Sequence, residues 1–105
     1  TEELQTFWDL IQYNDGVKIY HRLIRYMDER KQFRKRWVDP LIDSDVPTRV
    51  INGPEDPVSG RHMAEHYRKL VAHPDIVYLE GIGHYPQTED PDGVIRIYIA
   101  FRNAL

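Results

Sequence analysis

The chain has 105 residues, of which 41% are hydrophobic and 30% charged, with a formal net charge of -3. This length allows at most one domain, and this composition is typical of a globular protein. The absence of cysteine excludes thiol catalysis and thiolate metal sites, and the negative charge gives the whole chain no nucleic-acid signature. No apolar run approaches the roughly 20 residues that a membrane span needs.

The N-terminus is acidic, with Glu2 and Glu3 leading directly into an amphipathic segment. It has neither the basic region nor the apolar stretch of a signal peptide, so we expect a cytoplasmic protein. Because the chain starts at Thr1 within a predicted helix, we expect a fragment or a processed chain.

Two helices are predicted in the first part of the chain. Residues 2–12 carry apolar side chains at helical spacing, and the sequence Asn14-Asp15-Gly16 then predicts a turn. A longer helix is expected from 17 to 42, with Pro40 kinking or ending it near Asp39. Its apolar face advances in steps of three or four residues and comprises Tyr20, Leu23, Met27, Phe33, Trp37 and Leu41, with Arg30 as an exception.

The second part of the chain reads as strand, helix, strand, helix. Strands are expected at 46–52 and 76–79. A helix at 59–72 with Ser59 as its N-cap lies between them, and a loop then runs to a last helix with Asp90 as N-cap and Pro91 at its first position. This alternation predicts an α/β fold with parallel strands and a right-handed crossover. Two parallel strands do not form a stable sheet alone, so the rest of the sheet is expected from residues outside this chain.

The loop after each expected strand contains a residue that can take part in proton transfer. Asp56 follows the first strand and His84 follows the second. Ligands of α/β sheets bind beyond the carboxyl ends of the strands, and neighbouring parallel strands bring both loops to that edge. A histidine with a carboxylate at its far ring nitrogen can act as a general base. The group that it would activate, a nucleophile or a water, must come from another strand. Taken singly, each residue is better explained as ordinary loop or turn chemistry, and only the two loops together make a functional explanation as strong.

Both loops resemble those of a known superfamily. The stretch from Gly53 to Val58 is similar to the acid loop of the α/β-hydrolases, in which a glycine precedes the aspartate by three. The stretch from Gly83 to Pro91 is similar to their terminal histidine loop, with its Gly-His pair, its glutamate five residues on and its helix-opening proline. Within the superfamily the chain is most similar to the epoxide hydrolase and haloalkane dehalogenase branch. A narrower subfamily is indicated by His-Tyr-Pro-Gln at 84–87 and Arg-Tyr-Met-Asp-Glu-Arg at 25–30.

The resemblance implies a C-terminal segment of an α/β-hydrolase fold, with residues 1–14 ending a helical cap and residues 15–105 belonging to the core. Asp56 would be the triad acid and His84 the general base, and Val58 and Tyr85 would line the substrate pocket. The nucleophile, an Asp or a Ser, would come from the missing N-terminal remainder of the same protein, and no cofactor is implied. Epoxides or haloalkanes are the expected small organic substrates. The alternatives are a serine esterase or lipase-like hydrolase, and a non-catalytic interaction protein with the same fold.

Two other patterns have a functional and a structural explanation. His62, Glu65 and His66 fit H-x-x-E-H, an inverted zinc-protease pattern, but a short pattern of this kind arises easily by chance on a solvated helix face. A basic cluster at 30–36 could bind nucleic acid, yet flanking acidic residues cancel most of its field, which favours a solvated helix face. No glycine-rich phosphate loop is present.

Overall fold

A computed structural model describes all residues from 1 to 105, and helices and strands are both present. The chain forms two units, Thr1–Val38 and Asp39–Leu105. The expected division at residue 14 concerns the cap and core of a longer protein and stays a prediction. No helix has the length and apolar character required to cross a membrane.

The first unit contains helices only. Helix α1 (Glu2–Gln12) has the predicted bounds, and the predicted turn follows it with Asn14 and Asp15 at φ 52° and 60°. These left-handed values suit Asn and Asp, whose short polar side chains tolerate that region. The helices that follow are the 3₁₀ segment η1 (Tyr13–Ile19), α2 (Tyr20–Leu23), α3 (Tyr26–Gln32) and the start of α4 (Arg34–Ile42).

The prediction of one continuous helix from 17 to 42 is wrong. Bonds of the i→i−3 type at Arg25, Met27 and Asp28 tighten the chain between α2 and α3, and Phe33, at φ -107° and ψ 19°, ends α3. None of these helices has a buried residue, so no packed core holds the expected apolar face straight. Pro40 does not end the helix at Asp39, because α4 continues to Ile42 and Asp43 N–H still donates to Asp39 O at 3.1 Å.

The second unit is built on two parallel strands, β1 (Arg49–Asn52) and β2 (Asp75–Tyr78), which confirms the predicted strand order. The register pairs Arg49 with Asp75 and Asn52 with Tyr78. At the first pair Arg49 Nε also donates to Asp75 Oδ2 at 2.9 Å, so an ion pair fixes the register at one end. Strand β1 is shorter than expected, and β2 has the expected length but begins one residue earlier.

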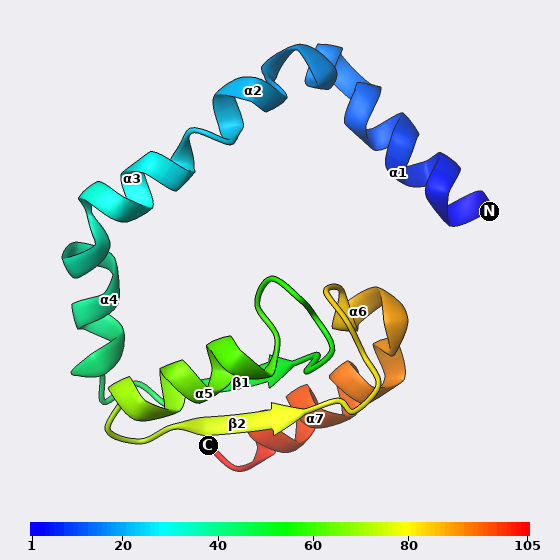
Figure 1. Cartoon of the computed structure of the whole chain (residues 1–105). Helices are drawn as coiled ribbons and strands as arrows, with labels where there is room; N and C mark the ends of the chain where they lie inside the picture. Colours follow the sequence, from blue (N-terminus) through cyan, green and yellow to red (C-terminus); the bar gives the residue numbers. More distant parts are fainter. The chain divides into compact units, whose positions relative to one another are not determined.

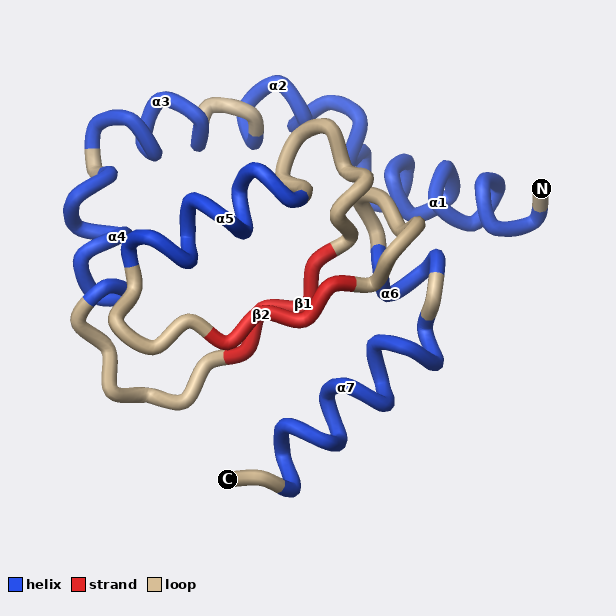
Figure 2. The backbone as a smooth tube through the Cα atoms, turned by 60° about the horizontal axis from the view of Figure 1, so that its bottom comes forward, coloured by secondary structure: helices blue, strands red, loops and turns tan.

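Helices α5 (Arg61–Leu70) and α7 (Pro91–Asn103) lie on opposite sides of this sheet (Figures 1 and 2). Right after α5 the chain enters β2, as a crossover between parallel strands requires. Ala64 of α5 and Leu79 after β2 are the buried hydrophobic residues, with exposed fractions of 0% and 8%. A core this small leaves most apolar side chains of the chain in contact with solvent.

The helix starts in this unit are partly as predicted. Asp90 caps α7 by accepting from Gly93 N–H at 3.0 Å, and Pro91 holds the first helical position, as expected. The N-cap of α5 is Gly60 and not Ser59, because the Ser59 side chain is engaged elsewhere. The short helix α6 (Pro86–Glu89), expected as loop, turns the chain back between the histidine loop and α7.

Candidate active site

The loops that follow β1 and β2 lie side by side at the carboxyl edge of the sheet, next to α6 (Figures 1 and 2). They are joined directly, because Glu55 N–H donates to Ile82 O at 3.1 Å. Gly53 makes this approach possible, since a Cβ at that position would overlap the carbonyl groups of Ile82 and Gly83. The glycine three residues before Asp56 therefore has a steric reason.

Asp56 is buried, with an exposed fraction of 5%, and its carboxylate is fully engaged. Oδ1 accepts from Val58 N–H at 2.8 Å, and Oδ2 accepts from Ser59 N–H at 3.0 Å and from Ser59 Oγ at 2.6 Å. Burial by itself would raise the pKa of Asp56, but the hydrogen bonds from Ser59, Val58 and His84 outweigh it and hold the pKa well below its usual value. Asp56 is therefore a fixed negative charge.

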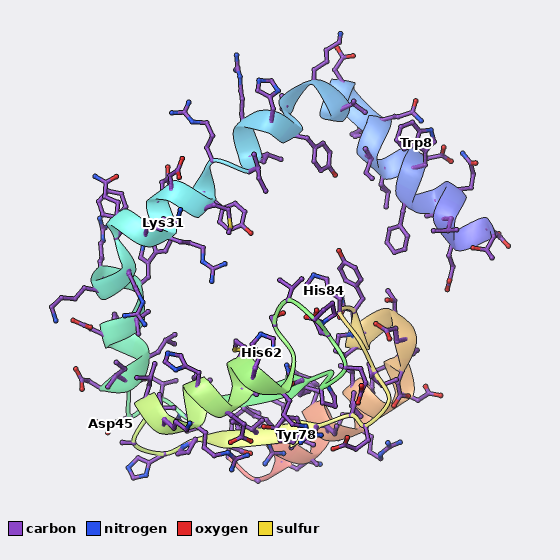
Figure 3. The ribbon with its side chains drawn as sticks, in the orientation of Figure 1. Trp8, Lys31, Asp45, His62, Tyr78 and His84 are labelled. Carbon is purple, nitrogen blue, oxygen red and sulfur yellow. The ribbon has the colours of Figure 1, made fainter.

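His84 meets this carboxylate across the two loops. Its Nδ1 lies 2.7 Å from Asp56 Oδ2, although 28 residues separate them. The His84 side chain is 46% exposed, and Figure 3 shows it at the end of its loop, beside the loop that follows β1. Because a carboxylate only accepts, Nδ1 carries the proton that it donates, which leaves Nε2 of the neutral ring as a free acceptor.

The backbone around His84 is held by Glu89 of α6. Its Oε2 accepts from Gly83 N–H at 2.7 Å and its Oε1 accepts from Tyr85 N–H at 2.9 Å. These two backbone hydrogen bonds lower the pKa of Glu89 below its usual value. Sequence reasoning assigned Glu89 no role beyond a match to the family pattern. Its spacing after the Gly-His pair was the available signal.

Val58 and Tyr85 lie next to the pair and are 73% and 56% exposed. The Tyr85 ring meets the His84 ring edge to face, with centroids 4.7 Å apart. A cavity of about 180 Å³ is lined by Asp56, His84 and eight further residues, and neither Val58 nor Tyr85 is among them. Their role as pocket residues stays a prediction.

Glu55, the neighbouring carboxylate, is exposed and does not contact His84, whereas Asp56 is buried and does. This difference agrees with the spacing argument that chose Asp56.

The H-x-x-E-H residues of α5 do not form a metal centre. Glu65 accepts from Tyr78 Oη at 2.7 Å and pairs with Arg68, while His62 Nε2 lies 3.2 Å from Val58 O. No three His, Asp or Glu side chains of the chain are grouped so that they could hold a metal ion. In the basic cluster, Arg30 lies over the Tyr26 ring at 6.0 Å, and α3 and α4 present no buried residue.

No family model matches the chain, and no solved structure matches it significantly. Curated relatives do. The chain is similar to mesoderm-specific transcript proteins. It is 38% identical to the one from Mus musculus and 39% identical to the homolog from Homo sapiens, in both cases over 104 residues and 97% of this chain.

A bacterial relative gives a similar result. The chain is 40% identical over 90 residues, or 86% of its length, to the Mycobacterium tuberculosis protein named "Putative hydrolase LipZ". The stretches at 25–30 and 84–87 predicted a narrower similarity to mesoderm-specific transcript proteins and bacterial relatives, and the chain is similar to proteins of both kinds. The chain spans about a third of the length of each relative, 31%. The matched region contains both loops, and two thirds of each relative lie outside it.

Proposed function

We propose that this chain is the C-terminal portion of an α/β-hydrolase and that Asp56 and His84 are the acid and the base of its catalytic triad. The single observation that carries the proposal is the 2.7 Å contact between His84 Nδ1 and Asp56 Oδ2 at the carboxyl edge of parallel strands. Two further findings support it: LipZ is named as a hydrolase, and the similarity to LipZ includes most of this chain.

In this proposal His84 Nε2 is the atom that moves a proton. Asp56 keeps the ring in the tautomer with the proton on Nδ1 and stabilises the imidazolium that forms when Nε2 takes a second proton. Because the Asp56 carboxylate is held by donors from Val58 and Ser59 as well, it has no freedom to turn away during the reaction. The chemistry therefore needs one more group, a nucleophile within reach of Nε2.

The nucleophile belongs to the N-terminal remainder of the protein, which is the partner of this chain. With an Asp nucleophile, as in epoxide hydrolases and haloalkane dehalogenases, the carboxylate attacks a substrate carbon and forms an ester, and the leaving atom is either a halide ion or the epoxide oxygen, which takes up a proton from an acidic group of the remainder or from water. His84 then takes a proton from a water, which attacks the ester carbonyl and releases an alcohol and the free Asp. With a Ser nucleophile, as in esterases and lipases, His84 takes the hydroxyl proton instead.

The same remainder would complete the sheet. Two strands with Ala64 and Leu79 as the buried hydrophobic residues form a small core, while Trp8, Trp37 and Tyr98 are each more than 40% exposed. In this proposal residues 1–14 end a helical cap, which would place Trp8 and Tyr13 against the substrate pocket, and residues 15–105 belong to the core. The cytoplasmic location stays a prediction.

The test replaces His84 by Gln in the full-length protein and measures turnover of an epoxide, a haloalkane and a p-nitrophenyl ester. Gln keeps size and polarity but cannot act as a base, so we expect kcat to fall by roughly 10⁴-fold or more on whichever substrate the wild type accepts. His73, which lies after α5 and away from the loops, provides the matched control, and His73→Gln should leave kcat unchanged.

Mass spectrometry of the full-length His84→Gln protein after incubation with substrate identifies the nucleophile. An Asp nucleophile leaves an alkyl ester trapped on a carboxylate, whereas a Ser nucleophile, which needs the base before it can attack, leaves the protein unmodified. Undiminished turnover of His84→Gln would refute the catalytic assignment. No turnover by the wild type on any of the three classes would favour the non-catalytic alternative.

A further inference from the structure

One oxygen of Asp56 serves two different partners. Oδ2 accepts from His84 Nδ1 at 2.7 Å and, at the same time, from Ser59 Oγ at 2.6 Å and from Ser59 N–H at 3.0 Å. The hydroxyl contact is the shortest of the three, and it comes from a residue to which the proposed triad assigns no part. Donors that share one oxygen compete for the same negative charge.

Ser59 is fixed in this place by its surroundings. Asn52, at the end of β1, donates from Nδ2 to Ser59 O at 2.9 Å, so the strand end holds the Ser59 backbone. Gly60 follows at a position where a Cβ would overlap the carbonyl groups of Pro54 and Asp56, which keeps the turn tight. The N-cap position of α5 belongs to Gly60, so the Ser59 hydroxyl is not used to start the helix.

We propose that Ser59 is a positioning residue that sets the basicity of His84 through Asp56. Its hydroxyl draws charge away from Oδ2, so the carboxylate stabilises the His84 imidazolium less strongly than an uncompeted carboxylate would. The backbone N–H groups of Val58 and Ser59 keep Oδ2 pointed at Nδ1 without the hydroxyl. Removal of the hydroxyl should therefore make His84 a stronger base. The consequence for catalysis rests on the proposed function, whereas the effect on the imidazole does not.

Two other residues lie near the His84 ring and could affect its basicity. Glu89 of α6 is the second carboxylate near the imidazole and interacts with it electrostatically, and the Tyr85 ring lies against it edge to face. Both stay in place when the Ser59 hydroxyl is removed, because their contacts are with the backbone of Gly83 and Tyr85 and with the His84 ring. A change in His84 titration on substitution of Ser59 is therefore attributable to Asp56.

The experiment titrates the His84 ring by NMR in the full-length protein, as wild type and as Ser59→Ala, Ser59→Thr and Ser59→Cys. Ser59→Ala keeps the backbone N–H contact and removes only the hydroxyl, so we expect the midpoint of the His84 ring titration to move to higher pH. Ser59→Thr restores the hydroxyl and should return the wild-type value. Ser59→Cys, with its weak S–H donor, should lie between them and serves if Ser59→Ala does not fold.

Two results would overturn the proposal: an unchanged His84 pKa in Ser59→Ala and Ser59→Cys, or a rise of equal size in Ser59→Thr. A purely structural role of Ser59 would lower the thermal midpoint without raising the pKa, so the midpoint is measured alongside.

The titration needs no substrate, which separates this proposal from the hydrolase proposal. If the protein turns over substrate, the acidic limb of its kcat/KM profile should move to higher pH with the His84 pKa in Ser59→Ala. If the full-length protein is inactive but the pKa still rises, the inference about Ser59 stands and the proposed function fails.

Discussion

The acid loop and the histidine loop hold their functional side chains in different ways. Asp56 is fixed by donors within its own loop, from Val58 and Ser59, and is almost fully buried. His84 makes one hydrogen bond with its ring, to Asp56, and remains 46% exposed, while Glu89 holds the backbone on either side of it. The position of the carboxylate therefore depends mainly on its own loop. The position of the imidazole depends on groups outside its loop, Asp56 and Glu89. A rigid acid and an accessible base are the arrangement that proton transfer at Nε2 requires.

The largest effect is expected at the point where the two loops meet. In Asp56→Asn an amide replaces the charge and offers Nδ1 a donor, so the tautomer that leaves Nε2 as an acceptor loses its support. In the full-length protein kcat should fall by roughly 10³- to 10⁴-fold, and the fall should exceed any change in KM. Glu55→Gln is the matched control at the exposed neighbour, and an equal loss there would contradict the choice of Asp56.

A smaller effect is expected where the two backbones touch. Replacement of Gly53 by Ala would place a methyl group against the carbonyl oxygens of Ile82 and Gly83. Because these are backbone atoms, the overlap is relieved only if the acid loop moves away from the histidine loop. Urea unfolding of full-length Gly53→Ala should show a free energy of unfolding that is lower by about 1–3 kcal/mol, together with reduced turnover.

Gly81→Ala tests backbone strain without close approach, because nothing lies within 4 Å of a Cβ built at Gly81 but its φ is +78°. The free energy of unfolding of Gly81→Ala should be lower than that of the wild type by about 1 kcal/mol, with turnover retained. A larger loss of stability in Gly81→Ala than in Gly53→Ala would contradict the close-approach argument.

The smallest effect is expected from the support of the histidine loop. Glu89→Gln keeps one backbone acceptor and loses the other, so His84 should be held less tightly and kcat should fall by roughly 10-fold with little change in KM. The lowered pKa of Glu89 also has a pH consequence. A carboxylate with a lowered folded-state pKa adds stability above its unfolded-state pKa, and the folded protein loses this contribution as the pH falls through the lowered value.

For Glu89 the relevant window therefore lies below its ordinary pKa of 4.5. Wild-type stability should decline there as the pH falls, and Glu89→Gln should show a shallower decline. The thermal midpoint of both proteins is measured between pH 5 and the acid limit of folding. Equal slopes of midpoint against pH would show that Glu89 does not contribute to the pH dependence of stability. Glu80→Gln, a substitution of an exposed carboxylate that pairs with Arg61, is the control for general charge effects.

The features that could be predicted from the sequence share a local or topological cause. Asp90 and Pro91 start α7 because capping chemistry acts within one turn, and β1 and β2 are parallel because a helix separates them. The meeting of Asp56 and His84 follows from that topology, since both residues come directly after a strand.

The features that could not be predicted depend on groups distant in the sequence. The helix expected from 17 to 42 breaks at Arg25 and Phe33, and none of the residues of α2, α3 and α4 is buried in a core that would hold it straight. The prediction of Ser59 as a helix cap is wrong because α5 begins only at Arg61 and because the Ser59 hydroxyl donates to Asp56, three residues before it. The role of Glu89 becomes visible only once α6 turns its carboxylate back toward Gly83.

The central claim is that Asp56 and His84 act as one unit, and a double-mutant cycle tests this most directly. The kcat of full-length wild type, His84→Gln, Asp56→Asn and the double variant is measured on one substrate. If the acid acts only through the base, the double variant should be no slower than His84→Gln alone. Losses that multiply, so that the double variant is slower by the full Asp56→Asn factor, would show independent roles and contradict the account.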